Sequence, residues 1–550
     1  MKKKQVLAVL VLGLFSGFKA LACTNILVGK NASADGSVMI SYSSDDFGMF
    51  GSLWQFKAGK HPKGTYREVY NWEDNAYLGK IPEAPVTYDV IGNINEHQVS
   101  IAETTFGGRE ELVDTAGILD YGSLIYIALQ RSKTAREAID VMTDLVKKYG
   151  YASEGESFSI ADPNEVWIME MIGKGAGRKG AVWVAVRIPD DCICAHANQS
   201  RIRKFDRKDK KNCMYAPDVI SLAREKGYFN GKDEDFDFAA AYCPLTFSGL
   251  RFCEARVWSF FNKWVDGMDR YIGYASGKKD EWNNPMPLYV KPKRKLSIRD
   301  VQNCMRDHYE DTPFDMTGDI SAGPYEAPYR PTPLSWDCNG KKYFNERPIS
   351  TQQAAFVFVS QLRSFMPNPV GGILWFANDE ANTTPFTPVY CCTKNVPECY
   401  DRHTADGVTF SWKSAFWVCN WVANMVYPRY SMLFGDLKKV RDELENQYAA
   451  NQKTVEDEAQ KLMKTSKLEA EEYLDRYTNK VAGEMLERWK ALGEFLIVKY
   501  NDGVTRKEEN GVFKRTKHGL GERPVRSGYP NAYRERIVRE TGERYEIPAE

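Results

Sequence analysis

Between residues 23 and 198, short apolar segments alternate with turn sequences, and this pattern constrains the fold more than any other feature of the chain. TNILVGK and SVMISY flank a turn containing Asp35-Gly36, a pair suited to the positive φ angles of tight turns. Three more pairs flank turn sequences: VIGNI and VSIAET, SFSIA and EVWIMEMI, and VWVAVRI and CICAHAN. We therefore predict four hairpins and extensive antiparallel sheet.

Helical patterns accompany these strand patterns. Residues 121–150 have apolar side chains at helical spacing, a Thr134-x-x-Glu137 cap signature and Gly150 as a stop signal. We expect two helices there, packed on the sheet, and further helices near residues 221–226 and 298–308. The predicted class is α+β, with sheets inside and helices outside.

The composition changes near residue 436, and this change indicates the domain organisation. Residues 436–500 are charged and helix-forming, with Gly483 and Gly493 as the only expected breaks. They predict two or more long helices packed on a main domain of residues 23–435, with a coiled-coil dimer contact as the alternative. Residues 501–550 are polar and predicted to be a loop-like tail.

Composition also limits the partners of the protein. Lysine plus arginine equals aspartate plus glutamate at 74 each, so no bulk charge directs the chain to nucleic acid or acidic lipid. An aromatic content of 13% is typical of a well-packed globular protein. No apolar stretch after the first residues approaches membrane length, so we expect no stable membrane span, and a homo-oligomer remains open.

The chain has twelve cysteines, which ordinarily indicate disulfides in an exported protein. Cys192 and Cys194 form one cluster, and Cys391, Cys392 and Cys399 form another. Either cluster is open to zinc ligands, disulfides or buried thiols. Because neither has a second CxxC or an HxxxH at ligand spacing, we expect no metal and no other cofactor.

The first 22 residues have the features of a cleavable secretory signal. Lysines at positions 2–4 precede an apolar run over residues 6–15, and Ala20-Leu21-Ala22 supplies small residues two apart. We predict export to the periplasm or the cell exterior, with Cys23 as the first residue after cleavage. A lipoprotein signal is the alternative, although it normally has an aliphatic residue at the position of Ala20.

An N-terminal cysteine carries both a thiol and a base. The reference pKa is about 7.7–8.0 for an α-amine and about 8.5 for a thiol, so moving the proton costs only about 1 kcal/mol. The thiolate can attack an amide carbonyl and form a thioester, while the α-ammonium protonates the leaving amine. A carboxylate to orient the ammonium is available in Asp45 or Asp46, and Asn198 can donate to an oxyanion. His196 is interpreted as a structural histidine.

These residues form part of a longer resemblance. Cys23-Thr24, Asp35-Gly36-Ser37 and Asp45, followed by NINEHQVSIAETTFGG, CAHANQSRI and EARVW, resemble secreted dipeptidases of the N-terminal-nucleophile (Ntn) cysteine peptidases, relatives of the secernins. The chain is more distantly similar to choloylglycine hydrolases and penicillin V acylases. RPISTQQAAFVFVSQLRSFMP, GGILWFANDEANTTPFTPVY and FSWKSAFWV extend the resemblance over roughly residues 23–420. It implies a four-layer αββα sandwich and hydrolysis of small peptides, with dipeptides as substrates.

The resemblance also implies roles for individual residues. Cys23 aligns with the nucleophile, Asp45 with the carboxylate near the α-amine, and Asn198 with the oxyanion-hole asparagine. Arg256 matches an active-site arginine, with Arg251 as a rival position.

Two further positions concern the substrate. Thr105 falls where relatives place a residue near the oxyanion hole, and Glu103 or Asp46 is available to bind a substrate amine. One departure affects charge: relatives often have a basic residue and Asn before the carboxylate, whereas residues 41–44 here are Ser-Tyr-Ser-Ser. Two expectations stay open for this departure: the activity is altered, or Arg256 carries the task of the missing cation alone.

Two other functions remain open from sequence. A hydrolase of bile-salt-like or other N-acyl amides would use the same chemistry with an apolar acyl pocket. A lipoprotein with an acylated Cys23 would have no free amine or thiol, so its domain would only bind a ligand or partner.

Overall fold

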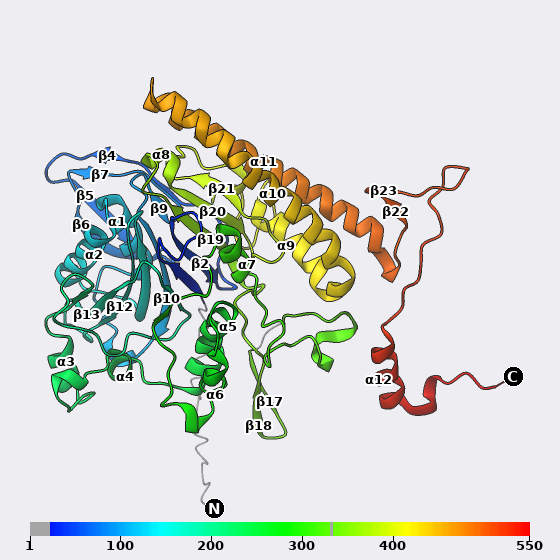
Figure 1. Ribbon diagram of the computed structural model, residues 1–550, viewed down its shortest axis with the longest axis horizontal. Coiled ribbons are helices and arrows are strands. Elements are labelled where there is room, and N and C mark those ends of the chain that lie inside the picture. The colour runs from blue at the N-terminus through cyan, green and yellow to red at the C-terminus, as the bar shows by residue number, and fades with distance from the viewer. Residues whose placement is uncertain (1–22, 331–333, 550) are drawn as a thin grey trace, which may run out of the picture.

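The computed structural model describes residues 23–330 and 334–549, with two large antiparallel sheets at its centre (Figure 1). The predicted leader, residues 1–22, lies outside the described residues. The seven-stranded sheet has the order β16 (Tyr289–Val290), β14 (Ile193–His196), β1 (Asn25–Val28), β2 (Val38–Asp45), β19 (Ala354–Leu362), β20 (Ile373–Asn378) and β21 (Thr387–Tyr390). The eight-stranded sheet has the order β15 (Cys213–Tyr215), β13 (Ala181–Ile188), β12 (Val166–Gly173), β11 (Gly155–Ala161), β10 (Ser100–Gly107), β9 (Ile94–Asn95), β8 (Val90–Ile91) and β3 (Gln55–Phe56).

The two sheets pack against each other, and helices cover them. Strands β1 and β2 of one sheet contact β10 of the other, and β2 also reaches β11 and β12. Helices α1 (Tyr121–Arg131), α2 (Ala135–Tyr149) and α3 (Val219–Glu225) pack on the eight-stranded sheet. Helices α5 (Ala255–Trp264), α7 (Ile298–Cys304) and α9 (Ala415–Val426) pack on the seven-stranded sheet. The α+β class predicted from the sequence is confirmed.

The helix pair at residues 121–150 forms as its cap signals predict. The Thr134 hydroxyl accepts a hydrogen bond from the Glu137 backbone N–H at 3.2 Å, which satisfies a donor at the start of α2. Gly150 ends the helix with a φ of 85°, a conformation that favours glycine. The helices expected near residues 221–226 and 298–308 are α3 and α7.

Three of the four predicted hairpins are confirmed and one is wrong. β1 pairs with β2, β9 with β10, and β11 with β12. The segments VWVAVRI and CICAHAN become β13 and β14, which lie in different sheets: β13 pairs with β12 and β15, whereas β14 pairs with β1 and β16. The turn between them therefore crosses from one sheet to the other. The prediction failed because turn residues indicate where the chain reverses direction, but they do not determine which strand pairs with which.

The charged C-terminal segment folds into two long helices, α10 (Tyr430–Met463) and α11 (Lys467–Tyr500). They contact each other, and both contact β21, so the predicted packing on the main domain is confirmed. A buried ion pair at 2.7 Å joins Arg363, directly after β19, to Glu456 on α10 and holds the helices against the sheet.

The expected breaks at Gly483 and Gly493 are wrong, because both residues lie inside α11. The chain turns instead at residues 464–466, where the Ser466 hydroxyl accepts from the Glu469 N–H at 3.2 Å and starts α11. Gly493 has a packing role, since a Cβ atom there would lie 2.1 Å from the ring of Trp421 on α9.

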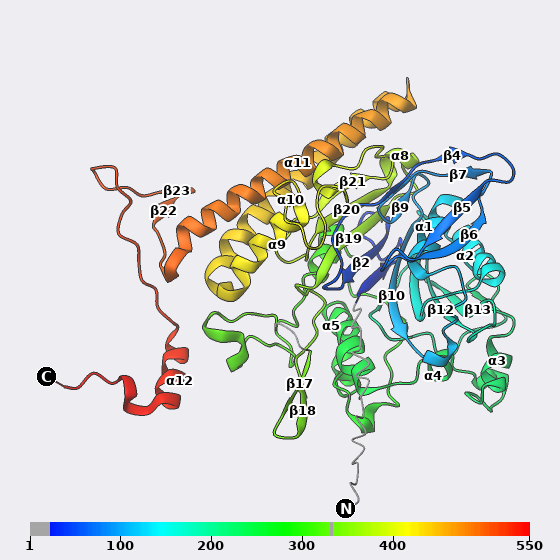
Figure 2. The same ribbon diagram turned by 180° about the vertical axis from the view of Figure 1, so that it is seen from behind.

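The remaining described elements are short. Small two-stranded sheets are formed by β4 (Gly59–Lys60) with β7 (Val86–Thr87), β5 (Tyr66–Tyr70) with β6 (Tyr77–Pro82), and β17 (Ser335–Cys338) with β18 (Lys341–Phe344). Short helices are α4 (Phe238–Tyr242), α6 (Ile272–Ala275) and α8 (Asn368–Gly371). The tail contains β22 (Glu508–Glu509), β23 (Val512–Phe513) and α12 (Asn531–Thr541), and is otherwise irregular. Figures 1 and 2 show it beside the body, and α12 buries no residue.

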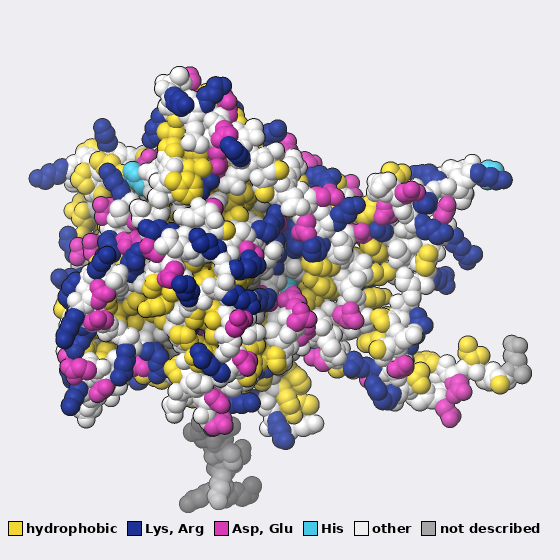
Figure 3. Space-filling view, in the orientation of Figure 1, with side chains coloured by type: hydrophobic (Ala, Val, Ile, Leu, Met, Phe, Trp, Pro, Cys, Tyr) yellow, Lys and Arg dark blue, Asp and Glu magenta, His cyan; other side chains and the backbone are white. Residues whose placement is uncertain are grey.

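The distribution of charge on the surface agrees with the equal numbers of basic and acidic residues in the sequence. Figure 3 shows basic and acidic side chains interspersed over the face in view. All twelve cysteines lie in the described part of the chain and none forms a disulfide there, so of the alternatives left open for the two clusters the structure shows buried thiols. Ten of them, including both clusters, are buried thiols. Among the described helices, none is both long and apolar enough to cross a bilayer.

Candidate active site

Cys23 immediately precedes β1 in the seven-stranded sheet, and its side chain is 4% exposed. Its neighbour Thr24 bridges to Ser43 on β2 through two hydrogen bonds, from the Thr24 N–H to the Ser43 hydroxyl and from the Ser43 N–H to the Thr24 carbonyl. This pairing fixes Cys23 beside the end of β2, where Asp45 lies. The strand arrangement alone therefore brings the predicted nucleophile and the predicted carboxylate together.

Asp45 is buried and held from two sides. Its Oδ2 accepts hydrogen bonds from the Ser43 hydroxyl at 3.0 Å and from Arg347 Nη2 at 2.5 Å. Its Oδ1 is buried and has no partner among the described residues. Burial raises the pKa of Asp45 above its usual range, although the positive charge of Arg347 opposes the shift.

Arg256 and Asn198 meet on the other side of Cys23. Arg256, near the start of α5, donates from Nη1 to the Cys23 carbonyl at 2.6 Å and from Nη2 to Asn198 Oδ1 at 2.9 Å. Asn198 follows β14 with a φ of 60°, and its Nδ2 donates to the Thr105 carbonyl at 2.8 Å. Arg251 lies elsewhere, paired with Glu346. The structure thus places Arg256, and not the rival Arg251, against Cys23.

A group of acidic and phenolic side chains from β2 and β10 faces the sulfur. Cys23 Sγ lies 3.8 Å from the Tyr42 hydroxyl and 3.8 Å from Glu103 Oε1. The same Glu103 oxygen accepts a hydrogen bond from Tyr42 at 2.6 Å. Burial, together with the negative charges of Glu103 and Asp45, raises the pKa of the Cys23 thiol well above its ordinary range. In the full-length chain, the sulfur is therefore a protonated thiol.

Thr105 and Asp46, the two remaining predicted residues, also lie at this site. Thr105 donates from its hydroxyl to Glu156 Oε1 at 2.8 Å, so the hydroxyl holds a carboxyl group. Asp46 is partly exposed, and its Oδ1 accepts from the Gly48 N–H at 2.6 Å. A narrow hollow at this site, partly open to solvent, is lined by Cys23, Tyr42, Ser44, Asp45, Asp46, Met49, Glu103, Thr105 and Tyr121.

His196 is buried and takes no part in this hollow. One ring nitrogen is 2.7 Å from the Thr104 hydroxyl and the other is 2.8 Å from the Ser159 hydroxyl. Burial lowers the pKa of His196 to about 3, so the ring is neutral. It links β14 to β10 and β11 across the two sheets, which agrees with its interpretation as a structural histidine.

Arg347, Tyr42 and Glu156 belong to the site but were not predicted. Arg347 lies in the loop before β19, 302 residues from its partner Asp45, so no local signal joins them. It supplies a cation to a site whose sequence lacks the usual basic residue before the carboxylate. Tyr42 could have been found by its position three residues before Asp45, whereas Glu156 has no distinguishing signal.

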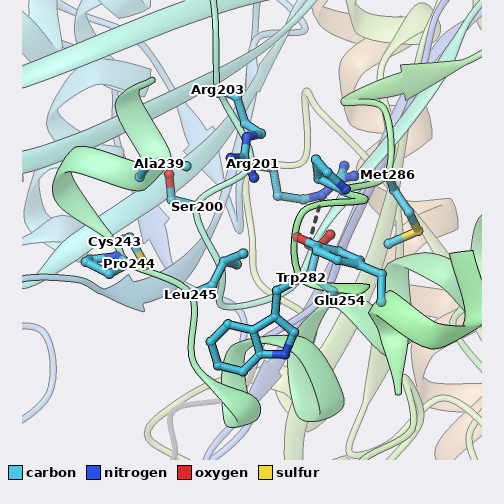
Figure 4. Close-up of a pocket in the computed structure, with 13 residues that line it drawn as sticks. Ser200, Arg201, Arg203, Ala239, Cys243, Pro244, Leu245, Glu254, Trp282 and Met286 are labelled. Atoms are coloured by element: carbon cyan, nitrogen blue, oxygen red, sulfur yellow. Dashed lines mark hydrogen bonds and ion pairs between the residues drawn. The ribbon is translucent and has the colours of Figure 1, made fainter. Parts of the chain in front are cut away.

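A second, larger hollow, of about 250 Å³, is lined in part by Ser200, Arg201, Leu245, Glu254 and Trp282 (Figure 4). Arg201 does not leave a charge free for a ligand there. It donates to Glu254 at 2.9 Å, shown as the dashed line, and to the carbonyls of Ala195, Pro287 and Leu288. The reactive groups therefore gather in the smaller hollow around Cys23.

Comparison with known proteins agrees with this geometry. A probable dipeptidase of Latilactobacillus sakei is 27% identical over 467 residues, which cover 80% of this chain and 89% of the relative. A probable dipeptidase of Salmonella dublin is 26% identical, covering 71% of this chain and 85% of its own. Dipeptidase A of Lactobacillus helveticus is 27% identical, covering 76% and 85%. The family model of peptidase family C69 matches residues 22–72 and 58–443. The chain belongs to peptidase family C69 and is a peptidase.

Proposed function

We propose that this protein is an exported dipeptidase that hydrolyses its substrate through Cys23 as an N-terminal nucleophile. Three curated relatives that span most of the chain are named as dipeptidases or probable dipeptidases, which supports the substrate class. The two facing sheets with helices on them support an Ntn-hydrolase αββα sandwich. The single observation that carries the proposal is the convergence of Asp45, Arg256, Asn198 and Glu103 on Cys23.

Removal of the leader after Ala22 is the activating step in this proposal. It gives Cys23 an α-amine that can take the proton from its own thiol. The resulting ammonium places a positive charge next to the sulfur and lowers the cost of forming the thiolate. The Oδ1 of Asp45, buried and without a partner among the described residues, supports this step because it is available to accept a hydrogen bond from that ammonium.

The reaction then proceeds in two halves. The Cys23 thiolate attacks the peptide carbonyl carbon, and the peptide C–N bond breaks as the α-ammonium gives its proton to the leaving amine. The product of this half is a thioester and a free amino acid. Water attacks the thioester, gives a proton to the α-amine, and releases the second amino acid with the thiol restored.

Positioning of the reacting atoms depends on the polar groups around Cys23. Arg256 holds the Cys23 carbonyl and the Asn198 side chain, so it fixes the nucleophile relative to the proposed oxyanion donor. Asn198 would stabilise the negative charge that develops on the substrate oxygen. Arg347 keeps Asp45 ionised for the ammonium by opposing the effect of burial on the Asp45 pKa.

The site favours this proposal over an N-acyl amide hydrolase. Asp45, Asp46 and Glu103 line the hollow around the sulfur, whereas an acyl chain requires apolar walls. Acidic walls suit a substrate that carries a positive charge.

A dipeptide panel assayed with the chain that begins at Cys23 tests the proposal. We expect hydrolysis by this protein and loss of at least 1,000-fold in Cys23→Ala and Cys23→Ser. Cys338→Ala is the matched control, because Cys338 is exposed on β17 and should be dispensable. Full activity in Cys23→Ala would refute the nucleophile. The mass of the mature N-terminus decides the lipoprotein alternative: added acyl chains on Cys23 would exclude the catalytic role.

A further inference from the structure

Glu103 and Glu156 form a buried carboxyl pair in the wall of the Cys23 hollow. They lie on adjacent strands, with Thr105 on β10 directly opposite Glu156 on β11, and their exposures are 2% and 1%. Glu103 accepts a hydrogen bond from Tyr42, and Glu156 accepts one from Thr105. Two buried carboxylates side by side repel each other, so protonation of one of them is favoured. Burial raises the pKa of both, and the neighbouring charge of Glu103 raises that of Glu156 further.

The pair has no cationic partner in the described part of the chain. The ion pair of the site joins Arg347 to Asp45, and no ion pair among the described residues includes Glu103 or Glu156. The side chains that contact the pair are instead a thiol, a phenol and an alcohol: Cys23, Tyr42 and Thr105. One proton on the pair leaves one negative charge, and that charge is buried without a cation from the described residues, which is unfavourable unless a cation binds there.

The distance from the sulfur identifies which cation fits. In a peptide with a free N-terminus, the α-nitrogen lies only about 2.5 Å from the first carbonyl carbon, because N–Cα and Cα–C are about 1.46 and 1.52 Å. A carbonyl carbon in position for attack lies roughly 3–3.5 Å from the sulfur. The α-nitrogen must therefore be recognised within a few ångströms of Cys23 Sγ, and Glu103 Oε1, at 3.8 Å, lies within this range. Asp46 suits this role less, since its Oδ1 is already bound to the Gly48 N–H.

From this geometry we infer that the Glu103–Glu156 pair is the receptor for the free α-ammonium group of the substrate. This inference rests on the proposed function and adds the specificity of the enzyme. The site selects peptides that are cleaved at the bond after their N-terminal residue. Ammonium binding neutralises the buried charge and brings the first peptide bond onto the sulfur. Peptides with an acylated or absent N-terminal amine leave the charge uncompensated and are rejected.

Binding to an inactive enzyme tests the receptor apart from catalysis. The parent protein is the chain that begins at residue 23 with Cys23→Ala, and calorimetry compares L-alanyl-L-alanine with propionyl-L-alanine, which differs only by lacking the α-amine. We expect the parent to bind the amine form roughly 10- to 100-fold more tightly, the range of a charged hydrogen bond. The double variant Glu103→Gln with Glu156→Gln removes the charge and should bind the two ligands within about threefold of each other.

Two single variants serve as controls. The Glu156→Gln variant retains the negative charge of Glu103, and the new amide can donate a hydrogen bond to that carboxylate. This variant should therefore still bind L-alanyl-L-alanine more tightly than propionyl-L-alanine. Glu154→Gln removes an exposed carboxyl two residues from Glu156 and should also keep it. Circular dichroism and thermal unfolding establish that each variant is folded. In the enzyme with Cys23 intact, the same double substitution should reduce kcat/KM for L-alanyl-L-alanine through KM.

The outcomes separate this inference from the proposed function. An undiminished amine preference in the folded double variant, or no preference in the parent, would overturn the receptor even if dipeptides are hydrolysed. Loss of the preference in the double variant alone supports it. Failure of the proposed function has another signature, namely that the chain beginning at Cys23 hydrolyses no dipeptide or that Cys23→Ala retains activity.

Discussion

Replacement of Arg347 by Met tests the electrostatic design of the site. The Arg347 and Asp45 side chains are 4% and 0% exposed and 2.5 Å apart, so the substitution leaves a buried carboxylate without its cation. Breaking such a pair from one side typically costs about 3–5 kcal/mol. This loss is a large fraction of the 5–15 kcal/mol that commonly stabilises a folded protein. Urea unfolding at fixed pH measures it.

The stability lost in Arg347→Met should depend on pH in a defined direction. Without Arg347 the pKa of Asp45 rises further, because that arginine is the main group that lowers it. The folded variant then binds more protons than the unfolded chain above the ordinary Asp pKa of 3.8, so its stability falls as pH rises. We expect the deficit of Arg347→Met relative to the parent to be larger at pH 8 than at pH 5.

Two further variants show whether the pair itself is responsible. Adding Asp45→Asn to Arg347→Met removes the unpaired charge and should restore at least half of the lost stability. Lys413→Met is the surface control, since Lys413 and Glu398 are 73% and 74% exposed, and it should leave stability unchanged. A loss below about 1 kcal/mol at pH 8 in Arg347→Met, or a deficit that grows toward pH 5, would refute the reasoning.

Other parts of the molecule give further predictions. His196 has an ordinary pKa of 6.5 and a folded pKa of about 3, so the unfolded chain binds the extra proton and roughly 5 kcal/mol of stability is lost from pH 6.5 to 3. His196→Gln should flatten this dependence in unfolding measurements, and an unchanged curve would show that other groups cause it. Gly493→Ala should lower the Tm, at a cost of about 1–3 kcal/mol, because its Cβ would meet Trp421 at 2.1 Å. Gly483→Ala, with no atom within 4 Å, should raise it, and equal shifts would contradict the packing role.

Local sequence signals predicted the positions of most helices and strands, but not every pairing between strands. Thr134 and Gly150 marked the ends of α2 because caps and stops act within one turn of helix. The assignment of β13 and β14 to one hairpin failed, because alternation records burial and not which strand lies alongside. Gly483 and Gly493 were mistaken for breaks, since a glycine can also serve close packing within a helix.

The site was predictable where its residues lie near recognisable features. Cys23 follows the predicted leader directly, and Asp45 ends the strand that pairs with β1, so both could be identified from the sequence. Arg347 and Glu156 could not, because they reach the site through the strand order of the folded chain and have no motif of their own. The long-range topology therefore supplies both the cation of Asp45 and the second carboxyl beside Glu103.

The central claim is that the leader must be removed to make Cys23 catalytic. The most direct measurement compares dipeptide hydrolysis by two purified proteins that differ in one residue, one beginning at Cys23 and one that retains Ala22 before it. In the second protein the nitrogen of Cys23 is an amide and cannot accept the thiol proton. We predict that kcat/KM falls by at least 1,000-fold when Ala22 is retained, with both proteins equally folded. Equal activity, with intact mass confirming that Ala22 is still present, would contradict the mechanism.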